Sequence, residues 1–427
     1  MRDIALALIL VVLVPMCVKH PWIGIMTWIW VSLMSPHLQT FGFMFGMPVA
    51  MLVGGATLLG VLVTKDPRRM TMNPPVALLM MFTLWMVITY FFSLVNTSEN
   101  LDQLDKVLKI NLMTLVAIYV ISTRRQVDFV IGVLVLSLAF FGVKGGIFTI
   151  LTGGGFRVRG EGGFIAGNNE VGLALIMTIP LIYYLILITQ RRTLRWGLWA
   201  VALLNVVAVL GTQSRGALLG ILAMTMAFVL RSPKPWRLFL PIAGVISFVL
   251  MFMPESWWQR MDTISNYQAD ESAMGRINAW SMAFNIAKSN FFGGGFYLET
   301  DQVFSLYAPN PNFIAVAHSI YFQVLGQHGF IGLLLYLAFW VSVIATGWWV
   351  GRNARTPNDL ALARMIEISL VGFAAGGAFL NLAYFDGPYY LMVALVVLRY
   401  KLMGNEPKPY VAAGAALTTL PHAARIS

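Results

Sequence analysis

Three side chains capable of chemistry lie at the edges of apolar segments. Arg215 interrupts GTQSRGALLG (residues 211–220), between two long apolar stretches. A guanidinium keeps its charge in an apolar setting, and its planar fork of donors matches the geometry of phosphate. Arg276 lies in MGRINAWSMAF, and His318 lies in NFIAVAHSIYF. Two arginines and a histidine could bind an anionic group and accept a proton from a hydroxyl.

Other polar residues near these three could add to the same site. Arg157 and Arg159 form a basic pair in GGGFRVRGEGG, and Gln213 lies two residues before Arg215. An isolated arginine beside an apolar run is more often a snorkelling or solvated charge. Several arginines on one side of a membrane would instead indicate an anionic ligand that a lipid carries.

The histidines and glycines form no metal or nucleotide motif. His328 lies on a different helical face from His318, so the pair is a poor metal site. The sequence has no HExxH or Walker A motif, and its outer loops have no Asp-x-Asp. The glycine runs GGGF at 153–156 and GGG at 293–295 are more typical of turns or helix caps than of phosphate-binding nests. We therefore expect no metal and no cofactor.

The composition indicates an integral membrane protein. Hydrophobic residues make up 58% of the chain and charged residues 11%, whereas soluble domains carry roughly 25% charged residues. The net charge of +11 comes from small clusters of lysine and arginine on every second loop. This is the positive-inside pattern of a multi-pass chain, so we expect membrane lipids and no nucleic acid as partners.

Apolar runs of membrane-spanning length predict an all-α polytopic membrane protein with about twelve transmembrane helices. Residues 1–35 contain two short apolar runs around Lys19, His20 and Pro21. We interpret them as one broken crossing with a cytoplasmic N-terminus, and thirteen crossings with an outside N-terminus is the alternative. The other runs lie near 42–63, 75–95, 107–121, 127–150, 169–189, 194–211, 215–230, 236–253, 324–350, 364–382 and 386–402.

The long outer loop at 254–320 is predicted to form a folded, partly helical cap. Ile277, Trp280, Phe284 and Ala287 share one helical stripe, and FFGGGF then ends the helix. The predicted division has four parts: a transmembrane bundle at 1–253, a periplasmic catalytic loop or cap at 254–320, C-terminal transmembrane helices at 321–403 and a cytoplasmic tail at 404–427.

The motifs together resemble the O-antigen ligase family. GTQSRGALLG, MGRINAWSMAF and AHSIYFQVLGQHGFIGLLLYL occur in this order, and the resemblance covers roughly residues 40–402. The resemblance implies a GT-C-like enzyme of the bacterial inner membrane with its active site on the periplasmic side. Such an enzyme transfers a glycan from undecaprenyl pyrophosphate-linked O-antigen to a sugar hydroxyl of the lipid A–core acceptor, in lipopolysaccharide biosynthesis.

Matching the motifs gives each candidate residue a role. Arg215 and Arg276 correspond to the arginines that would bind the pyrophosphate, and His318 corresponds to the catalytic histidine. Further possible substrate contacts are Arg157, Arg159, Gln213, Tyr321 and Asp386. The chain departs from the family in having Ser319 after the histidine, where asparagine is common, and in having no proline before the glycines.

The expected chemistry is inverting and metal-independent. Pyrophosphate is a good leaving group, and two arginines can stabilise its negative charge in place of a metal. The acceptor hydroxyl needs a base, and a histidine ordinarily titrates near ~6.5. Asn310, Asn312 or a backbone carbonyl could orient the ring of His318.

Three alternatives remain open from the sequence. O-antigen polymerases often carry R-x10-G repeats in outer loops, which are absent here, and protein O-oligosaccharyltransferases often have an additional C-terminal domain. A lipid-linked glycan transporter or flippase would need ionisable residues near the middle of the membrane. Lys144 and Glu367 lie towards the ends of their predicted spans instead.

Overall fold

The computed structural model describes residues 1–65, 70–231 and 271–404, with a few single positions between 240 and 258. Apart from those positions, the predicted span at 236–253, the first part of the outer loop (254–270) and nearly all of the predicted tail lie outside the described residues. Within these ranges every long regular element is a helix, and no strand occurs.

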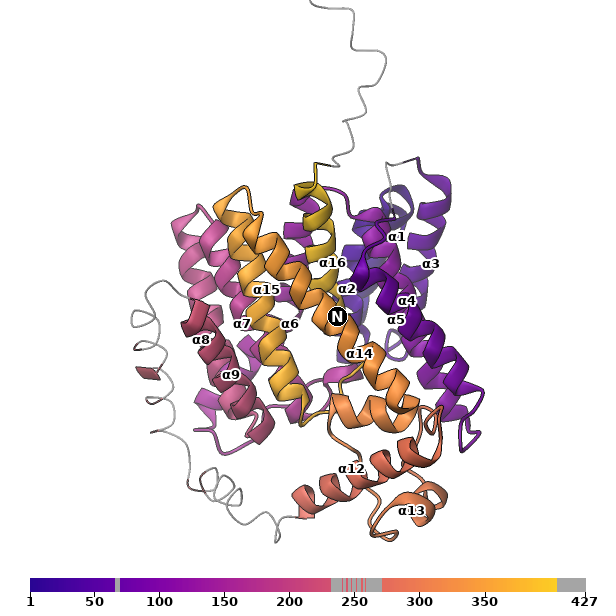
Figure 1. Cartoon of the computed structure of the whole chain (residues 1–427). Helices are drawn as coiled ribbons and strands as arrows, with labels where there is room; N and C mark the ends of the chain where they lie inside the picture. The colour runs from indigo at the N-terminus through magenta and orange to yellow at the C-terminus, as the bar shows by residue number, and fades with distance from the viewer. Residues whose placement is uncertain are drawn as a thin grey trace, which may run out of the picture.

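The N-terminal half forms a series of helices that run between the two ends of a bundle (Figure 1). These are α1 (Arg2–Lys19), α2 (Pro21–Met34), the 3₁₀ turn η1 (Pro36–Gln39), α3 (Val49–Val63), α4 (Pro74–Tyr90), α5 (Ser98–Val120), α6 (Arg124–Leu151), the 3₁₀ turn η2 (Gly163–Ile165), α7 (Asn168–Ile188), α8 (Arg192–Gly211) and α9 (Arg215–Arg231).

The C-terminal half contributes two helices outside the bundle and three within it. These are α12 (Glu271–Ser289), α13 (Asp301–Tyr307), α14 (Ile320–Arg352), α15 (Pro357–Gly377) and α16 (Asp386–Leu402). In Figure 1, α12 and α13 lie together at one end of the bundle. We call these two helices the cap, and the end of the bundle that they cover the cap end.

In the part of the chain that the structure describes, five helices are long and apolar enough to cross a membrane: α6, α7, α8, α14 and α15. The shorter helices α2, α3 and α4 are also apolar. The prediction of a multi-pass α-helical membrane protein is therefore confirmed, while the predicted number of crossings and the GT-C-like architecture stay predictions.

The first two helices are an antiparallel hairpin. The Arg2 guanidinium donates a hydrogen bond to the carbonyl of Gln39, and the Asp3 carboxylate accepts bonds from the backbone N–H groups of Gly42 and Met44. The start of α1 therefore lies beside the segment that follows α2. Pro21 begins α2 and disfavours helical geometry at the preceding residue, which ends α1.

This chain path differs from the predicted broken single crossing, while the number of crossings stays a prediction. The segment after α2 lies at the cap end, because a Cβ added to Gly162 in the α6–α7 loop would meet Leu38 at 2.5 Å. The start of α1 and the segment after α2 thus lie on the same side as the α6–α7 loop. This is the chain path expected from the alternative with an outside N-terminus.

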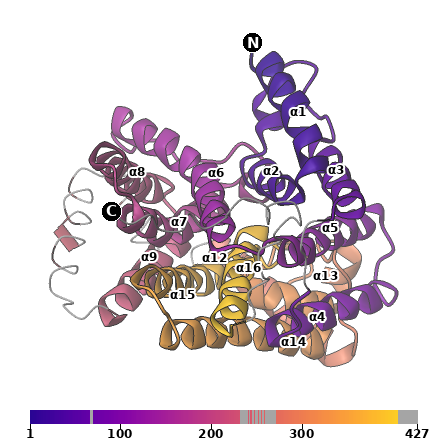
Figure 2. The same ribbon diagram turned by 90° about the horizontal axis from the view of Figure 1, so that it is seen from above.

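The helices on either side of the cap share one hydrophobic core. The largest cluster of buried residues extends from Leu6 to Leu398. α15 packs chiefly against α7 and α9, whereas α14 packs against α4. Figure 2 shows the same arrangement from above, with α9 beside α15 and α4 beside α14. The C-terminal helices therefore complete a bundle that the N-terminal helices begin.

The predicted cap helix is present as α12, and its buried face shares Ala287 with the predicted stripe but differs at other positions. Ile277 and Phe284 of the predicted stripe are 40% and 48% exposed. The buried face, which includes Ala279 and Ala283, is displaced by about one residue. Small residues let α12 approach α14 closely: a Cβ on Gly326 would lie 3.0 Å from that of Ala283. Close packing, rather than the largest apolar side chains, determines which face α12 buries.

The glycines after α12 form backbone hydrogen bonds with α14. Gly329 breaks α14 with a φ of 68°. The N–H groups of Gly294 and Gly295 donate to the carbonyls of Gly326 and Gln327, at 2.9 and 3.0 Å. The N–H groups of this GGG segment are therefore used in packing, as its interpretation as turn material predicts.

Candidate functional site

The turn before Arg215 is held by bonds to two other segments. Arg215 is half-buried and is the first residue of α9, and Gln213 has a φ of 52°. The Gln213 amide donates to the carbonyl of Gly154 at 3.0 Å, and the Asn168 amide donates to the carbonyl of Thr212 at 2.9 Å. These bonds hold a strained backbone in place and fix where Arg215 begins its helix.

Trp280 of α12 connects the segments that carry His318 and Arg215. Its indole N–H donates to the carbonyl of Ala317 at 2.6 Å, and its ring stacks on Phe322 with centroids 4.9 Å apart. The same ring lies 6.4 Å from that of Phe379. Phe379 in turn packs against the residue after Arg215, because a Cβ added to Gly216 would meet the Phe379 Cβ at 3.1 Å.

A second residue of α12, Asn278, holds the segment that precedes α14. Its amide group donates to the carbonyls of Asn310 and Phe313, at 2.9 and 2.8 Å. Its oxygen accepts from the N–H of Asn310 at 2.9 Å. We call residues 308–319 the strap. Bonds from α12 at both Asn310 and Ala317 fix the course of the strap towards His318.

His318 lies at the end of the strap in a strained and partly desolvated position. Its φ is 43°, a value that non-glycine residues rarely adopt. Its Nδ1 atom is buried and has no hydrogen-bond partner within the described residues. The side-chain oxygen of Asn310 accepts instead from the N–H of Asn312. Within the described residues, no side chain or carbonyl is therefore seen to orient the ring of His318 through Nδ1. Ser319, the departure from the family pattern, is the N-cap of α14.

Arg276 lies one helical turn before Trp280 and close to His318. Burial, and next the positive charge of Arg276, lower the pKa of His318 to about 4. The imidazole is therefore neutral at neutral pH and able to accept a proton, although it is a weaker base than an ordinary histidine. The structure thus brings together Arg276 and His318, which are far apart in the sequence.

The additional predicted contacts lie in varied surroundings. Arg157 and Arg159 are exposed on either side of buried Val158, whose N–H donates to the carbonyl of Gly211. The Tyr321 hydroxyl donates to the carbonyl of Ala374 at 3.0 Å. Their contacts with substrate stay predictions.

Asp386, another predicted contact, is fully buried at the start of α16. Its carboxylate accepts a hydrogen bond from the hydroxyl of Ser32 and interacts electrostatically with Lys106 of α5. The carboxylate is therefore paired within the fold, and its contact with substrate stays a prediction.

A cavity of about 550 Å³ lies at the cap end, beside the strap. This volume is within the range of small-molecule sites. Residues from five separate parts of the chain line it. They are Gln103, Lys106, Gly163, Phe164, Ala166, Gly167, Glu170, Phe296, Tyr297, Glu299, Val316, Gln323, Gln327, Asn381, Leu382 and Tyr384. We call it the polar cavity.

The part of the chain from α8 into α14 has a recognisable family pattern. Residues 200–337, which contain Arg215, Arg276 and His318, match the family described as O-Antigen ligase. The resemblance of this part of the chain to the O-antigen ligase family is therefore confirmed. Residues 1–192 match a family of unknown function (DUF5935).

Other comparisons give the O-antigen ligase assignment no added weight. No curated protein matches the chain. One solved structure, described as "Structural coordination of polymerization and crosslinking by a peptidoglycan synthase complex", has a similar chain at 15% identity and a TM-score of 0.40. The similarity covers 77% of this chain and 97% of that one.

The residues of the polar cavity were not predicted from the sequence. Lys106, Glu170, Glu299 and Asn381 come from four segments that meet only in the folded chain. Glu170 interacts electrostatically with Arg276, so the cavity wall reaches the family's predicted phosphate-binding residues. A spacing pattern cannot reveal such a set, because no two of its members share a local element.

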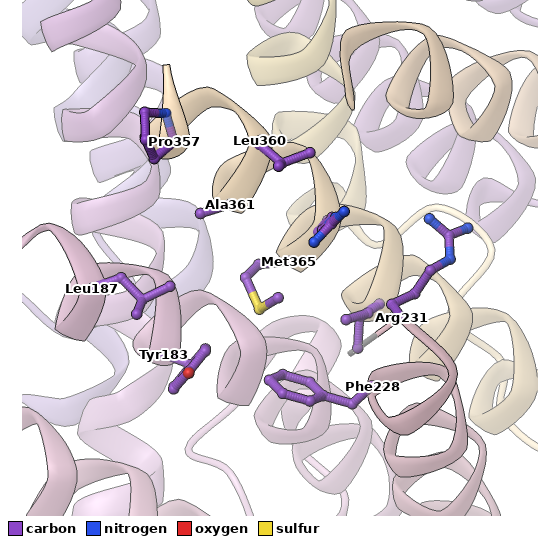
Figure 3. A pocket seen from close by; sticks show the side chains of 10 residues that line it. Tyr183, Leu187, Phe228, Arg231, Pro357, Leu360, Ala361 and Met365 are labelled. Atoms are coloured by element: carbon purple, nitrogen blue, oxygen red, sulfur yellow. The ribbon is translucent and has the colours of Figure 1, made fainter. Parts of the chain in front are cut away.

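A second cavity lies between the far ends of α7, α9 and α15 (Figure 3). Its walls include Tyr183, Phe228 and Arg231. Arg231 forms an ion pair with Glu367, which is 5% exposed. Because Arg215 and Arg231 are the two ends of α9, this cavity is separated from the O-antigen ligase motifs by the length of that helix. Among the described residues, no group of three metal-ligating His, Cys, Asp or Glu side chains occurs.

Proposed function

We propose that the chain is an O-antigen ligase that transfers a glycan from undecaprenyl pyrophosphate to a sugar hydroxyl of lipid A–core. The observation that carries the proposal is the proximity of Arg276 and His318 within a segment of the O-antigen ligase family. A neutral imidazole beside a guanidinium suits a reaction in which one substrate loses a proton and the other gains negative charge.

In the proposed reaction, His318 accepts the proton of the acceptor hydroxyl as its oxygen bonds to the anomeric carbon of the donor. The bond from that carbon to the pyrophosphate oxygen breaks, and the electron pair leaves with undecaprenyl pyrophosphate. Arg215 and Arg276 stabilise the charge that develops on the phosphate, so no metal is needed. A single displacement inverts the anomeric centre.

The acceptor distinguishes the proposed ligase from its closest rival. Deleting the gene should leave the lipid-linked glycan polymerised but unattached to lipid A–core, because the ligase acts after polymerisation. Lipid-linked glycans should be extracted and sized beside purified lipopolysaccharide. Accumulation of single repeats would assign the chain to the polymerases instead. Unchanged lipopolysaccharide together with loss of a glycosylated protein would assign it to the protein O-oligosaccharyltransferases.

The proposal also places the cap on the periplasmic side of the inner membrane. Ser272, near the start of α12, is exposed, whereas the chain's single cysteine, Cys17, is fully buried. A Ser272→Cys variant should therefore react with a membrane-impermeant maleimide in intact spheroplasts, and the parent chain is the matched control. Labelling that appears only after lysis would reverse the proposed topology.

A further inference from the structure

The polar cavity lies next to the residues proposed to react. Val316 of the strap lines it two positions before His318, and Glu170 lines it while interacting with Arg276. A group held in this cavity would therefore lie beside both the proposed base and one of the proposed phosphate-binding arginines.

Amide side chains dominate the polar part of the lining. Each amide offers both hydrogen-bond donors and an acceptor, which is what a ring bearing several hydroxyls requires. The four amides are those of Gln103, Gln323, Gln327 and Asn381. The Asn381 Oδ1 atom is buried and has no hydrogen-bond partner among the described residues. A buried acceptor of this kind is unfavourable until a donor reaches it.

Two of these amides have fixed orientations before any ligand binds. The Gln327 amide donates to the carbonyl of Phe296 at 2.7 Å, and its oxygen accepts from the Tyr384 hydroxyl at 2.6 Å. The oxygen of Gln323 accepts from the N–H of Ala383 at 3.2 Å, which leaves its NH₂ group as a donor. Preorganised polar groups of this kind reduce the entropy that a ligand must lose on binding.

The charges of the lining disfavour an anion. Lys106 lies 3.7 Å over the ring of Phe164 and interacts with buried Asp386, so its positive charge is already compensated. Glu170 and Glu299 also line the cavity. A phosphate or carboxylate would meet two carboxyl groups in this setting, whereas a neutral hydroxyl-bearing group would not be repelled.

We propose that the polar cavity is a subsite for an uncharged, hydroxyl-rich sugar ring adjoining the reacting atoms. The amides bond to its hydroxyls, and the rings of Phe164, Phe296 and Tyr297 provide apolar faces for its C–H groups. The ring belongs either to the donor glycan or to the acceptor. The subsite's role in transfer rests on the function proposed above, but sugar binding itself can be measured without turnover.

The test measures binding of free sugars to the purified full-length chain in detergent by saturation-transfer NMR. Methyl β-glucoside and N-acetylglucosamine are the neutral probes, and glucuronic acid and glucose 6-phosphate are the anionic probes. We expect millimolar binding of at least one neutral probe and at least tenfold weaker binding of its anionic counterpart. Equal or tighter binding of the anionic probes would overturn the proposal.

Substitutions locate the binding. Asn381→Ala and Gln103→Ala should each weaken binding of the neutral probe at least fivefold. Gln103 is exposed on α5, so its replacement leaves the fold intact. Asn353→Ala, an exposed asparagine at the far end of α14, is the matched control and should bind normally. Normal binding in both cavity variants, with unchanged melting temperatures, would contradict the proposed subsite.

A transfer assay then identifies the source of the ring. A raised KM for the acceptor alone in Gln103→Ala assigns the ring to the acceptor, and a raised KM for the donor alone assigns it to the donor. Unchanged KM values for both substrates would overturn the proposal. If the wild-type chain binds neutral sugars through Asn381 but transfers no glycan, the subsite stands and the proposed ligase function fails.

Discussion

Two histidines near the start of α14 lie in contrasting surroundings. His328, at the helix break, is fully buried, and its two ring nitrogens lie 2.7 Å from the Thr89 hydroxyl and 2.8 Å from the Tyr384 hydroxyl. His318, at the end of the strap, is half-buried, has a left-handed backbone and has a buried Nδ1 without a partner in the described residues. The same residue type thus completes a packed network in one region and is held in an unfavourable state in the other.

This difference indicates which signals distinguish a structural histidine from a candidate reactive one. Buried polar groups are normally satisfied, as His328 is. Strain and a lost partner persist only where the surroundings impose them, and they concentrate at functional sites. At His318 the surroundings are the strap, which is bonded to α12, and the charge of Arg276.

The largest expected effect is on turnover when His318 is replaced. His318→Ala should lower the rate of glycan transfer by ~100-fold or more, because the acceptor hydroxyl loses its base. Binding of the lipid-linked donor should stay within about twofold of wild type, since a base makes few ground-state contacts with the pyrophosphate. Transfer and donor binding should be measured on the same detergent-purified sample.

Asn312→Ala, an exposed change in the same strap, is the matched control and should keep most activity. Near-normal transfer by a folded His318→Ala variant would remove the contrast between the two histidines.

A smaller loss of activity is expected from Arg276→Lys. An ammonium keeps the charge but cannot present a bidentate fork to phosphate, so transfer should fall roughly tenfold or more, with a higher KM for the donor. Arg192→Lys, at the exposed start of α8, should leave both values unchanged. A donor KM that does not change in Arg276→Lys would argue against a phosphate contact.

His328→Ala should show the opposite pattern, with its main effect on stability. It removes a fully buried ring and leaves the hydroxyls of Thr89 and Tyr384 without this partner, at a cost of roughly 2–4 kcal/mol. A lower melting temperature in detergent, with kcat close to wild type at a temperature where the chain is folded, is the expected outcome. A large fall in kcat at unchanged stability would instead place His328 in the chemistry.

The smallest expected effect concerns the pH profile of kcat/KM, which reports groups of the free enzyme. Because the pKa of His318 is lowered to about 4, the imidazole stays neutral as pH falls towards that value, and activity is lost only below it. Arg276→Gln removes one cause of the lowering, so its acid limb should move to higher pH. A wild-type acid limb centred near ~6.5, the ordinary value for histidine, would contradict the desolvated setting.

The sequence predicts the helices and the main site residues but not their surroundings. Apolar periodicity predicts α12, and the family motifs predict that Arg276 and His318 act together. Apolar periodicity is a local signal, and the motifs derive from the resemblance to a family. The buried face of α12 includes the small residue Ala283, which packs closely against Gly326, a contact that apolar periodicity alone does not predict.

The N-terminal hairpin and the polar cavity depend on contacts between distant segments. Pro21 marks a break, but a break is compatible with either a kinked crossing or a reversal. The contacts of Arg2 and Asp3 with the segment after α2 decide between them. Asn381 and Glu299 similarly become neighbours only through the folded chain. The lowered pKa of His318 also depends on tertiary burial.

The break at Gly329 divides α14 into two helical parts. A continuous helix from Ile320 to Arg352 would be about 50 Å long, whereas the hydrocarbon layer is about 30 Å thick. Residues 330–352 alone give roughly 35 Å, enough for one crossing. The turns before the break are bonded to Gly294 and Gly295, in the segment that joins α12 to α13. The strap that ends in His318 is therefore bonded to α12, and the break at Gly329 separates it from the crossing part of α14.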